Sequence, residues 1–293
     1  MAAKIIDGKA TARQMREEIA QGVVELKKEK GITPGLGVIL VGDDPASHSY
    51  VRAKEKACEK SGIYSDNNCL PAETSEKQLL EMIEKMNSNT KIHGILVQLP
   101  LPDRIDEAKV LLAINPEKDV DGFHPVNIGK MVSGQASFLP CTPNGIIQLL
   151  KRYEIKTEGA EVVIVGRSNI VGKPLANMLI QKTDAGNATV TVCHTRTKDI
   201  TAHTRRADII IAAAGRPNMI TADMVKEGAA VIDVGVNRVE DSSKKKGYRL
   251  VGDVDFEAVK EKAGFITPVP GGVGPMTITM LLYNTLESAR RSC

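Results

Sequence analysis

Short, almost continuous apolar runs recur along this chain, and they constrain its fold more than any other feature. They have the length and the Val and Ile content of strands that are buried on both faces of a sheet. The runs span residues 36–42, 94–99, 161–166, 189–193, 208–215 and 229–235. Between them, apolar side chains recur at helical spacing, as at Met15, Ile19 and Val23. This alternation predicts an α/β protein with parallel sheets rather than an all-helical or an all-β fold.

Composition and charge favour a compact protein that handles a small molecule. The chain has 293 residues, enough for about two domains, and 42% of them are hydrophobic, so a sizeable core can form. Lys and Arg number 39 against 36 Asp and Glu, whereas nucleic-acid binders concentrate positive charge on one face. Aromatic residues make up 3% and Trp is absent, which leaves few platforms on which bases can stack. We therefore expect no nucleic-acid partner.

The sequence also argues against a membrane or a metal. Residues 263–286 carry no charge, but Pro268, Pro270 and Pro275 would break a membrane helix there. The first residues lack the charged start and the apolar run of a signal peptide. The five cysteines are spaced too irregularly for a disulfide framework or a Cys-x-x-Cys site. We expect a reduced, cytoplasmic protein with no membrane partner and no bound metal.

Two proline-rich breaks predict the domain organisation. The first lies near residues 140–148 and the second at 267–275. A final helix follows the second break, and its apolar face is expected to pack on the first domain. We therefore expect residues 1–143 and 275–293 to form one domain and residues 144–274 to form the other.

The segment VVIVGRSNIVGKP (162–174) has the strand–turn–helix pattern of a dinucleotide-binding loop. Gly166 ends the apolar run, and a helix is expected to begin near Gly172, where backbone amides can bind phosphate. The loop departs from the Gly-x-Gly-x-x-Gly pattern because Ser168 takes the second glycine position and the last glycine comes one residue late. An ordinary tight turn between a strand and a helix is the alternative reading.

The next predicted strand indicates which dinucleotide would bind. NAD sites place an acidic residue on the ribose at this strand end, but here the strand runs into Cys-His-Thr-Arg with no acid. Arg167, Thr195 and Arg196 together suit the additional phosphate of NADP. Alternatively, Arg196 is an ordinary surface residue. We favour NADP over NAD.

A second group of polar residues precedes this loop. Tyr50 and Lys54 stand one turn apart on a helix for which Asp44 and Pro45 provide a start signal. Without further signals, an amphipathic helix with an exposed lysine is the favoured explanation of this pair.

Three more polar residues follow the predicted strand at 94–99. Gln98 lies at its apolar end, and Asp119 and Asp121 lie in a turn-rich run. A glutamine there can be an ordinary core amide, and each aspartate an ordinary turn former.

Taken together, six segments carry a specific resemblance. They are the Tyr50–Lys54 pair, VQLPLP (97–102), DVDGFHP (119–125), PCTP (140–143), GRSNIVGKP (166–174) and PGGVGPMT (270–277). In this order, across almost the whole chain, they closely resemble the bifunctional methylenetetrahydrofolate dehydrogenase/methenyltetrahydrofolate cyclohydrolase family. The length matches the form with these two activities, without a formyltetrahydrofolate synthetase domain.

The resemblance implies two α/β domains flanking a cleft, the second a Rossmann-type parallel-sheet domain that binds NADP. It implies NADP-dependent oxidation of 5,10-methylenetetrahydrofolate to the methenyl cation, followed by hydrolysis to 10-formyltetrahydrofolate. Lys54 would be the catalytic lysine, Gln98 its partner and Tyr50 the residue that stacks on the aminobenzoate ring. The remaining substrate-binding residues implied are Asp121, Pro270 and Gly271. The cofactor-binding residues implied are Cys141, Thr142, Gly166, Arg167, Ser168, Thr195, Arg196, Val236, Gly274 and Thr277.

Relatives in this family are dimers through the cofactor domain, so the resemblance also implies a homodimer. Two alternative functions stay open from the sequence: a dehydrogenase without the hydrolytic step, and a non-catalytic regulator that binds folate or a dinucleotide. Use of NAD assisted by phosphate and magnesium, as in some mitochondrial relatives, ranks behind NADP because no targeting segment is visible.

Overall fold

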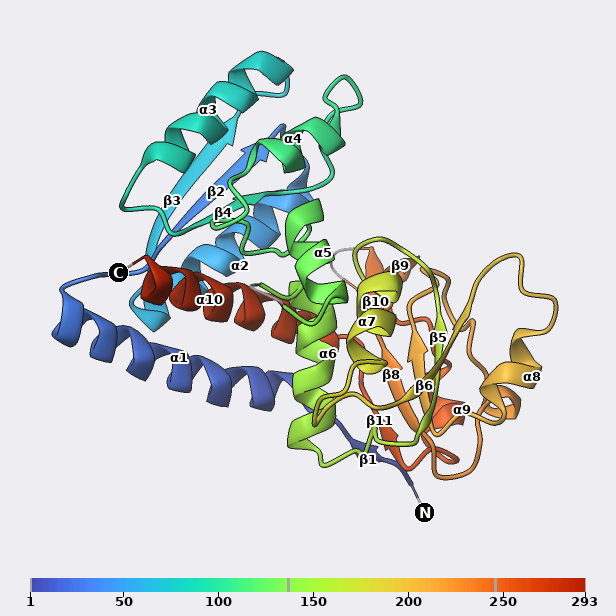
Figure 1. The fold of residues 1–293 in the computed structure, drawn as a ribbon. Helices are drawn as coiled ribbons and strands as arrows, with labels where there is room; N and C mark the ends of the chain where they lie inside the picture. The colour runs from blue at the N-terminus through green and yellow to red at the C-terminus, as the bar shows by residue number, and fades with distance from the viewer. Residues whose placement is uncertain (1, 136–137, 245–246, 293) are drawn as a thin grey trace. The chain divides into compact units, whose positions relative to one another are not determined.

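The computed structural model describes residues 2–135, 138–244 and 247–292, and the chain divides into two compact units. The larger-sheet unit comprises Met1–Ala12 and Thr142–Thr277, and the smaller-sheet unit comprises Arg13–Cys141 and Ile278–Cys293. Each unit combines a parallel sheet with helices, so the predicted α/β class is confirmed (Figure 1).

The larger-sheet unit contains a six-stranded parallel sheet. Its strands, in spatial order, are β1 (Lys4–Ile5), β11 (Phe265–Ile266), β8 (Ala230–Asp233), β7 (Ile209–Ala212), β5 (Glu161–Val165) and β6 (Thr189–Cys193). The chain leaves β5 toward β6 at the edge and then returns to β7 on the other side of β5. Such a reversal of strand order leaves a crevice at the carboxyl ends of the strands, where α/β proteins bind ligands.

Short helices complete this unit. They are α6 (Cys141–Arg152), α7 (Gly172–Leu179), α8 (Ile200–Thr204), the 3₁₀ helix η1 (Ala222–Met224) and α9 (Phe256–Val259), with a hairpin of β9 (Asn237–Glu240) and β10 (Tyr248–Val251). One face of the sheet, with Val163, Ile210 and Val231, shares a buried cluster with Met224 of η1 and Val259 of α9. Because side chains alternate between the two faces of a strand, Val163, Ile210 and Val231 share the face that these helices cover.

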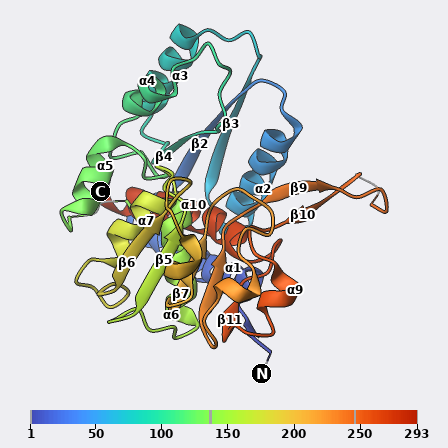
Figure 2. The same cartoon turned by 90° about the vertical axis from the view of Figure 1, so that its right-hand side faces the viewer.

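The smaller-sheet unit is built on three parallel strands. Their order is β3 (Tyr64–Leu70), β2 (Gly35–Val41) and β4 (Gly94–Val97). Its helices are α2 (Pro45–Ser61), α3 (Glu76–Ser88), α4 (Glu107–Ala113), α5 (Pro125–Val132), most of α1 (Gly8–Lys30) and most of α10 (Val273–Arg291). Figure 2 shows α3 and α4 on one side of this sheet and α2 on the other. Ile39 and Val41 of β2 accordingly pack against Leu79 and Ile83 of α3.

All six apolar runs contain a strand, so those predictions are confirmed. Strand β3 was not predicted, because its residues, YSDNNCL, are mostly polar. This strand lies at the edge of its sheet and pairs only with β2, so its side chains stay partly exposed and carry no continuous apolar signal. The short strands β1, β9, β10 and β11 were also not predicted.

The N-terminal segment differs from the expected domain division, which placed it with residues 13–143. Residues 1–12 group with the larger sheet because β1 pairs in parallel with β11. The Ala3 amide also donates to the Lys260 carbonyl at 2.7 Å, and the Ile6 amide donates to the Ile266 carbonyl at 2.8 Å. Among the described residues, no helix is both long enough and apolar enough to span a membrane.

Candidate active site and cofactor pocket

Helix α2 determines where Lys54 and Tyr50 lie. The Asp44 carboxylate caps the helix by accepting from the Ser47 amide at 2.8 Å, and Pro45 occupies the first turn, as the sequence predicted. The two side chains one turn apart have opposite environments. The Tyr50 ring is 51% exposed, whereas Lys54 is only 9% exposed. The reading of Lys54 as an exposed surface lysine is therefore wrong.

Gln98 is held opposite Lys54 by the end of β4. Its amide donates to the Ile39 carbonyl at 2.8 Å, which continues the pairing of β4 with β2. Its side-chain Nε2 donates to the Leu99 carbonyl at 2.6 Å, so Oε1 is left to accept from Lys54 Nζ at 2.7 Å. The lysine and the glutamine of the sequence prediction are thus in direct contact, and the amide can only accept from the amine.

The two aspartates of the 119–125 run have different surroundings. Asp119 is buried, and its carboxylate accepts from the amides of Gly122 and His124 and from Asn127 Nδ2. It therefore holds the turn that follows it. The Asp121 side chain is partly exposed and lies in the electrostatic field of Lys54. Only Asp121 is placed to meet a ligand.

Burial perturbs the charges of this lysine site, which we define as Lys54, Gln98 and Asp121. Desolvation lowers the pKa of Lys54 from its ordinary value, and the charge of Asp121 opposes part of that change. Desolvation raises the pKa of Asp121 to about 6, against the pull of Lys54. Both shifts favour the neutral forms. An amine whose pKa is lowered by burial and a carboxyl with a pKa of about 6 are suited to proton transfer.

Cys141 and Asn284 support the backbone next to Asp121. The Cys141 thiol, fully buried, donates to the Val120 carbonyl at 3.3 Å, and burial raises its pKa well above the ordinary value. Asn284 of α10 donates to the carbonyls of Val120 and Leu139 at 2.8 and 3.0 Å. Asn284 was not predicted from the sequence. Its position as a polar residue among the apolar residues of the last helix was the available signal.

The first loop of the cofactor region is the tight β5–α7 turn. A Cβ atom at Gly166 would lie 2.1 Å from the Ala213 carbonyl oxygen, so only glycine fits between β5 and β7. Ser168 Oγ accepts from the Val171 amide at 3.1 Å, which fixes the start of α7. The serine that replaces the second glycine therefore has a structural role, and its hydroxyl proton remains available to a ligand.

A cavity of about 370 Å³ opens at the tips of β5, β6 and β7, where the strand order reverses. Gly166, Arg167, Ser168 and Thr195 of the sequence prediction line it. Arg196 does not line it, and its assignment stays a prediction. His194 and Arg216 also line the cavity and were not predicted. Arg216 follows β7, a third strand end that carries no family motif, whereas His194 lies beside Thr195 at the end of β6.

The other predicted cofactor and substrate residues lie elsewhere in the chain. The Thr142 and Thr277 hydroxyls are 2.9 Å apart, so they belong to one hydrogen-bonded pair in the larger-sheet unit. Val236 is half exposed just after β8, and Gly274 lies in the first turn of α10. Pro270 and Gly271 precede that helix. The Gly271 carbonyl accepts from the Lys9 amide at 3.1 Å.

A larger cavity, of about 960 Å³, lies in the smaller-sheet unit and contains none of the predicted site residues. It is lined by residues such as Tyr64, His93 and Lys118 at the amino-terminal side of β2 and β4. Lys118 Nζ donates to the carbonyls of Met86, Asn87 and Asn89, so the ammonium group caps the C-terminal end of α3. We therefore place the chemistry at the lysine site.

These features define a class: an α/β protein with a dinucleotide-type crevice in one unit and a buried lysine–amide pair in the other. Comparison with known proteins specifies the family. Residues 6–121 match the catalytic domain of tetrahydrofolate dehydrogenase/cyclohydrolase, and residues 140–293 match the NAD(P)-binding domain of the same family. The chain therefore belongs to the tetrahydrofolate dehydrogenase/cyclohydrolase family, as the sequence motifs indicated.

Individual relatives agree over the full length. The chain is 64% identical over 292 residues to the bifunctional protein FolD of Syntrophus aciditrophicus, covering 100% of this chain and 99% of the relative. A crystal structure of the bifunctional FolD dehydrogenase/cyclohydrolase from Campylobacter jejuni aligns with a TM-score of 0.93 at 52% identity, over 100% of both chains. The Trypanosoma brucei enzyme, solved with NADP and an inhibitor, aligns with a TM-score of 0.94 at 41% identity, over 100% of this chain and 99% of that one.

Proposed function

We propose that this chain oxidises 5,10-methylenetetrahydrofolate with NADP and then hydrolyses the 5,10-methenyl product to 10-formyltetrahydrofolate. The observation that carries the proposal is the contact of the buried Lys54 amine with the neutral Gln98 amide, at 2.7 Å, in the field of Asp121. Family membership makes a second, independent support.

Lys54 is the proposed general base for the hydrolysis. At its ordinary pKa of 10.5 a lysine is almost fully protonated at neutral pH, but burial lowers the pKa of Lys54, and a cationic methenyl substrate would lower it further. Gln98 accepts one N–H of the amine, so the nitrogen lone pair of neutral Lys54 remains free to face water. The attacking water passes a proton to Lys54 as its oxygen bonds to the methenyl carbon. Lys54 then protonates the ring nitrogen as its bond to that carbon breaks, and the hydroxyl group on that carbon releases its proton to water as the formyl C=O forms.

The oxidation makes different demands on these residues. NADP, when bound, would supply the acceptor for the hydride of the methylene carbon. No proton passes to or from the protein in that step, so the chain contributes alignment of the reacting groups rather than acid–base chemistry. Lys54 and Gln98 then serve to position the folate, not to move a proton.

Asp121 and Tyr50 are the proposed folate-binding residues. The pterin edge presents an N–H and an amino group side by side, and one carboxylate can accept from both. Those bonds favour the ionised form of Asp121, whose pKa in the free protein is about 6. The exposed Tyr50 ring offers an apolar face for the aminobenzoate ring. Pro270 and Gly271 are proposed to line the substrate site as well.

The cavity in the larger-sheet unit fits NADP. Arg167 lines the cavity, and none of the described lining residues is acidic. An arginine suits the 2′-phosphate on the ribose of NADP. The acidic residue that would bind the free 2′-hydroxyl of NAD is not among them. Ser168 and Thr195 supply hydroxyl groups in the same cavity. We propose that the remaining predicted residues also contribute to this site: Cys141, Thr142, Gly166, Arg196, Val236, Gly274 and Thr277.

The two alternatives are disfavoured by the same contacts. A dehydrogenase without hydrolysis would use Lys54 only to position the folate, and positioning does not require an amine whose pKa is lowered by burial. A non-catalytic regulator has no need for perturbed pKa values at Lys54 and Asp121. We further propose that the protein is a homodimer through its NADP-binding unit and acts in the cytoplasm. The buried free thiols of Cys58, Cys141 and Cys193 support a reducing compartment.

An absorbance assay tests the proposed function. Purified protein is mixed with methylenetetrahydrofolate and either NADP or NAD, and formation of reduced cofactor and of the methenyl compound is followed. We expect faster reduction of NADP than of NAD, and separately added methenyltetrahydrofolate should disappear faster than it does in buffer. A protein that reduces neither cofactor, or that leaves the methenyl compound at its uncatalysed rate of loss, contradicts the proposal.

A further inference from the structure

The cofactor cavity has a third wall that the family motifs do not explain. Besides the β5 and β6 tips, residues 213–219 after β7 line it, and this segment contributes Arg216. The cavity therefore has two arginines, Arg167 and Arg216, on different strand-end loops. No aspartate or glutamate is among the described residues that line it. A small cavity with two cations and no acid is suited to a dianion.

A buried carboxylate fixes the segment that carries Arg216. Asp253 has no exposed surface, and its Oδ2 accepts from the amides of Ala214 and Gly215 at 2.6 and 2.8 Å. The backbone carbonyl of the same residue accepts from the Ile220 amide at 2.9 Å. Asp253 thus holds the segment immediately before Arg216 and again four residues after it. Its other oxygen, Oδ1, accepts from Asn237 Nδ2 at 2.8 Å.

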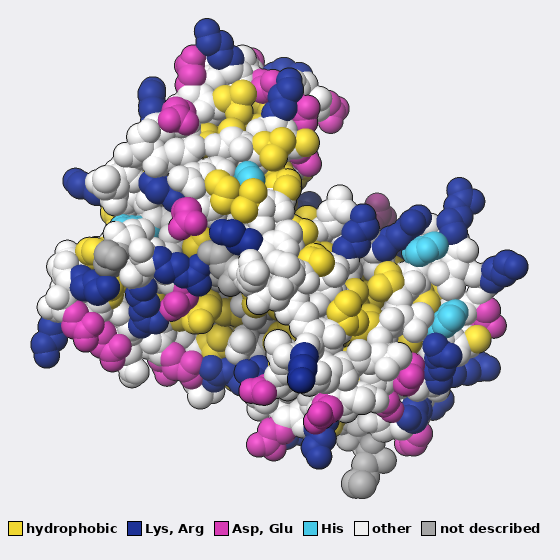
Figure 3. Space-filling model, in the orientation of Figure 1, with side chains coloured by type: hydrophobic (Ala, Val, Ile, Leu, Met, Phe, Trp, Pro, Cys, Tyr) yellow, Lys and Arg dark blue, Asp and Glu magenta, His cyan; other side chains and the backbone are white. Residues whose placement is uncertain are grey.

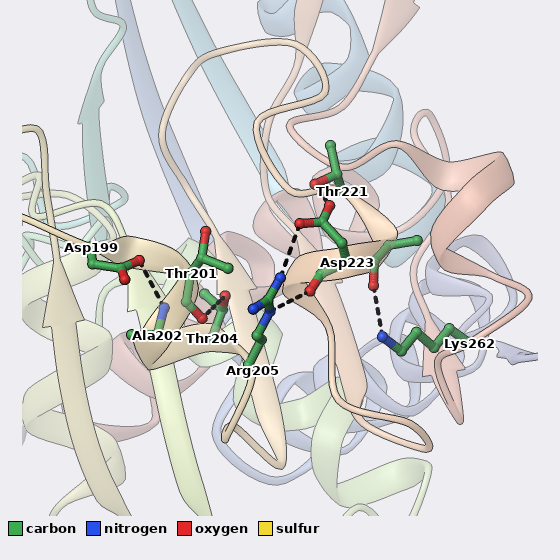
Figure 4. A network of polar contacts seen from close by, with 9 residues as sticks. Asp199, Thr201, Ala202, Thr204, Arg205, Thr221, Asp223 and Lys262 are labelled. Atoms are coloured by element: carbon green, nitrogen blue, oxygen red, sulfur yellow. Dashed lines mark hydrogen bonds and ion pairs between the residues drawn. The ribbon is translucent and has the colours of Figure 1, made fainter.

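A second network, drawn in Figure 4, anchors the chain just beyond this segment. Arg205 Nε donates to the Asp223 carbonyl at 2.8 Å, and its guanidinium lies 3.5 Å from the Asp223 carboxylate. Lys262 Nζ donates to the Ala222 carbonyl at 3.1 Å. These contacts attach η1 to α8 and to the segment after α9. The Arg216 loop is consequently held at both ends, which limits the positions that its guanidinium can reach.

The charge of Arg216 is available to a ligand. The residue is exposed, and none of the ion pairs found among residues 2–135, 138–244 and 247–292 involves it or Arg167. Arg205 and Arg206 in the same unit each lie within 4 Å of a carboxylate, Asp223 and Glu161. Figure 3 shows lysine and arginine side chains gathered toward the side of this unit that carries α8. An anion is therefore attracted to this region.

We propose that Arg216 is a specificity-determining residue that binds the 2′-phosphate of NADP together with Arg167, and that Asp253 is the positioning residue for it. The inference rests on the proposed function, because it assigns a residue to the same cofactor cavity. A guanidinium donates two parallel N–H bonds to a phosphate, and two guanidiniums from separate loops can take its oxygens from two sides. NAD lacks this phosphate, so the contact discriminates between the two cofactors.

The test uses two probes that contain no nicotinamide, adenosine 2′,5′-bisphosphate and 5′-AMP, with binding measured by titration calorimetry. Arg216→Ala should weaken the bisphosphate about tenfold, the range expected for loss of a charged hydrogen bond, and should change 5′-AMP less than about twofold. Arg216→Lys should give an intermediate loss, because an ammonium keeps the charge but not the fork. Arg206→Ala is the matched control, an exposed arginine of the same unit outside the cavity, and should bind both probes as the parent does.

The outcomes separate this inference from the proposed function. If the parent protein binds the bisphosphate no better than 5′-AMP, the NADP site itself is wrong and the inference falls with it. If the parent discriminates and Arg216→Ala retains the full discrimination, only the inference is overturned. Equal weakening of both probes also overturns it, because Arg216 would then contact the adenosine or the 5′-phosphate.

The positioning role of Asp253 is tested by the same ratio of affinities. Asp253→Asn should reduce the preference for the bisphosphate in the parent and should leave it unchanged in an Arg216→Ala background, since Asp253 acts through Arg216. A general loss of structure would lower both affinities in both backgrounds. Additive effects of the two changes on the ratio contradict the positioning role.

Discussion

The lysine site and the cofactor cavity treat charged side chains differently: burial favours the neutral forms at the first, whereas exposed arginines stay charged at the second. In the smaller-sheet unit, Lys54 and Asp121 sit in surroundings that penalise their charged forms, and the pKa of each moves toward neutrality. In the larger-sheet unit, Arg167 and Arg216 are exposed at strand-end loops. Buried titratable groups are needed where protons move. Permanent cations on a solvent-accessible rim are sufficient where a phosphate only has to be bound and recognised.

Because of this difference, removing a side chain at the two sites should affect different quantities: a reaction rate at the lysine site and cofactor affinity at the cavity. A buried amine that transfers a proton contributes to the barrier of one reaction step, so its removal affects one rate selectively. An exposed arginine contributes to binding, and water screens its contact, so its removal costs less and affects affinity.

The largest expected effect is on Lys54. Lys54→Met keeps the length and apolar stem of the side chain and deletes the amine, so methenyltetrahydrofolate hydrolysis should fall about 10²–10⁴-fold, the usual contribution of general acid–base catalysis. A measurable dehydrogenase activity should remain, and the methenyl compound should accumulate in the absorbance assay. Lys56→Met, an exposed lysine of the same helix, is the control. Hydrolysis at the parental rate, or equal loss of both activities, would refute the separation of roles.

Removal of Asp121 should affect both reactions together. Asp121→Ala deletes the acceptor for the pterin edge, and both kcat/KM values for folate should fall about 10- to 100-fold, as expected for loss of charged hydrogen bonds. Asp103→Ala, an exposed aspartate of the same unit, should leave them unchanged. Steady-state kinetics with folded variants decides the point. An effect on one activity alone would show that Asp121 acts in a chemical step instead of in binding.

Arg167 provides the corresponding test in the other unit. Arg167→Ala should raise KM for NADP about tenfold, with a smaller change for NAD and little change in the folate parameters. The measurement is initial rate against each cofactor, with Arg206→Ala as the matched control. Equal effects on NADP and NAD would mean that Arg167 does not contact the 2′-phosphate.

A charge placed beside Lys54 should shift its pH dependence. Gln98→Glu sets a carboxylate at the position of the 2.7 Å amide contact, and an opposite charge at that distance raises the pKa of Lys54. The basic form then appears only at higher pH, so the hydrolysis profile should move upward by about one pH unit. Rates measured across pH for Gln98→Glu and for the parent test this. An unshifted profile would mean that Lys54 is not the titrating base.

The smallest expected effect is on stability. The pKa of Asp121 is raised from 3.8 to about 6 in the folded protein, so the folded state binds more protons than the unfolded state between these values. The free energy of unfolding should therefore be highest below pH 3.8 as far as this group is concerned, and should fall as the pH rises through about 6. Asp121→Asn should remove that loss, on the order of 1 kcal/mol because the side chain is partly exposed. Denaturant unfolding of the parent and of Asp121→Asn, at a pH near 3.8 and at a pH above about 6, measures this loss. If the parent and the variant differ in free energy of unfolding by the same amount at both pH values, the raised pKa is contradicted.

Much of the fold followed from local pattern. The six apolar runs became β2, β4, β5, β6, β7 and β8, and Asp44 with Pro45 started α2 as expected. Strand β3 was not predicted, because an edge strand with one partner needs no apolar run. Strand β1 was not predicted, because it is only two residues long and its partner β11 lies far along the chain. This pairing is the reason why residues 1–12 belong to the larger-sheet unit.

The sequence by itself determined the α/β class, the six main strands, the family and the residue types at both sites, because these depend on periodicity and on short motifs. Only the tertiary structure decided that Lys54 is buried against Gln98, that Asp119 holds a turn while Asp121 stays partly exposed near Lys54, and that Arg216 joins Arg167 at one cavity. Burial, pKa and the meeting of distant loops depend on what the rest of the chain places around a residue. No local pattern contains that information.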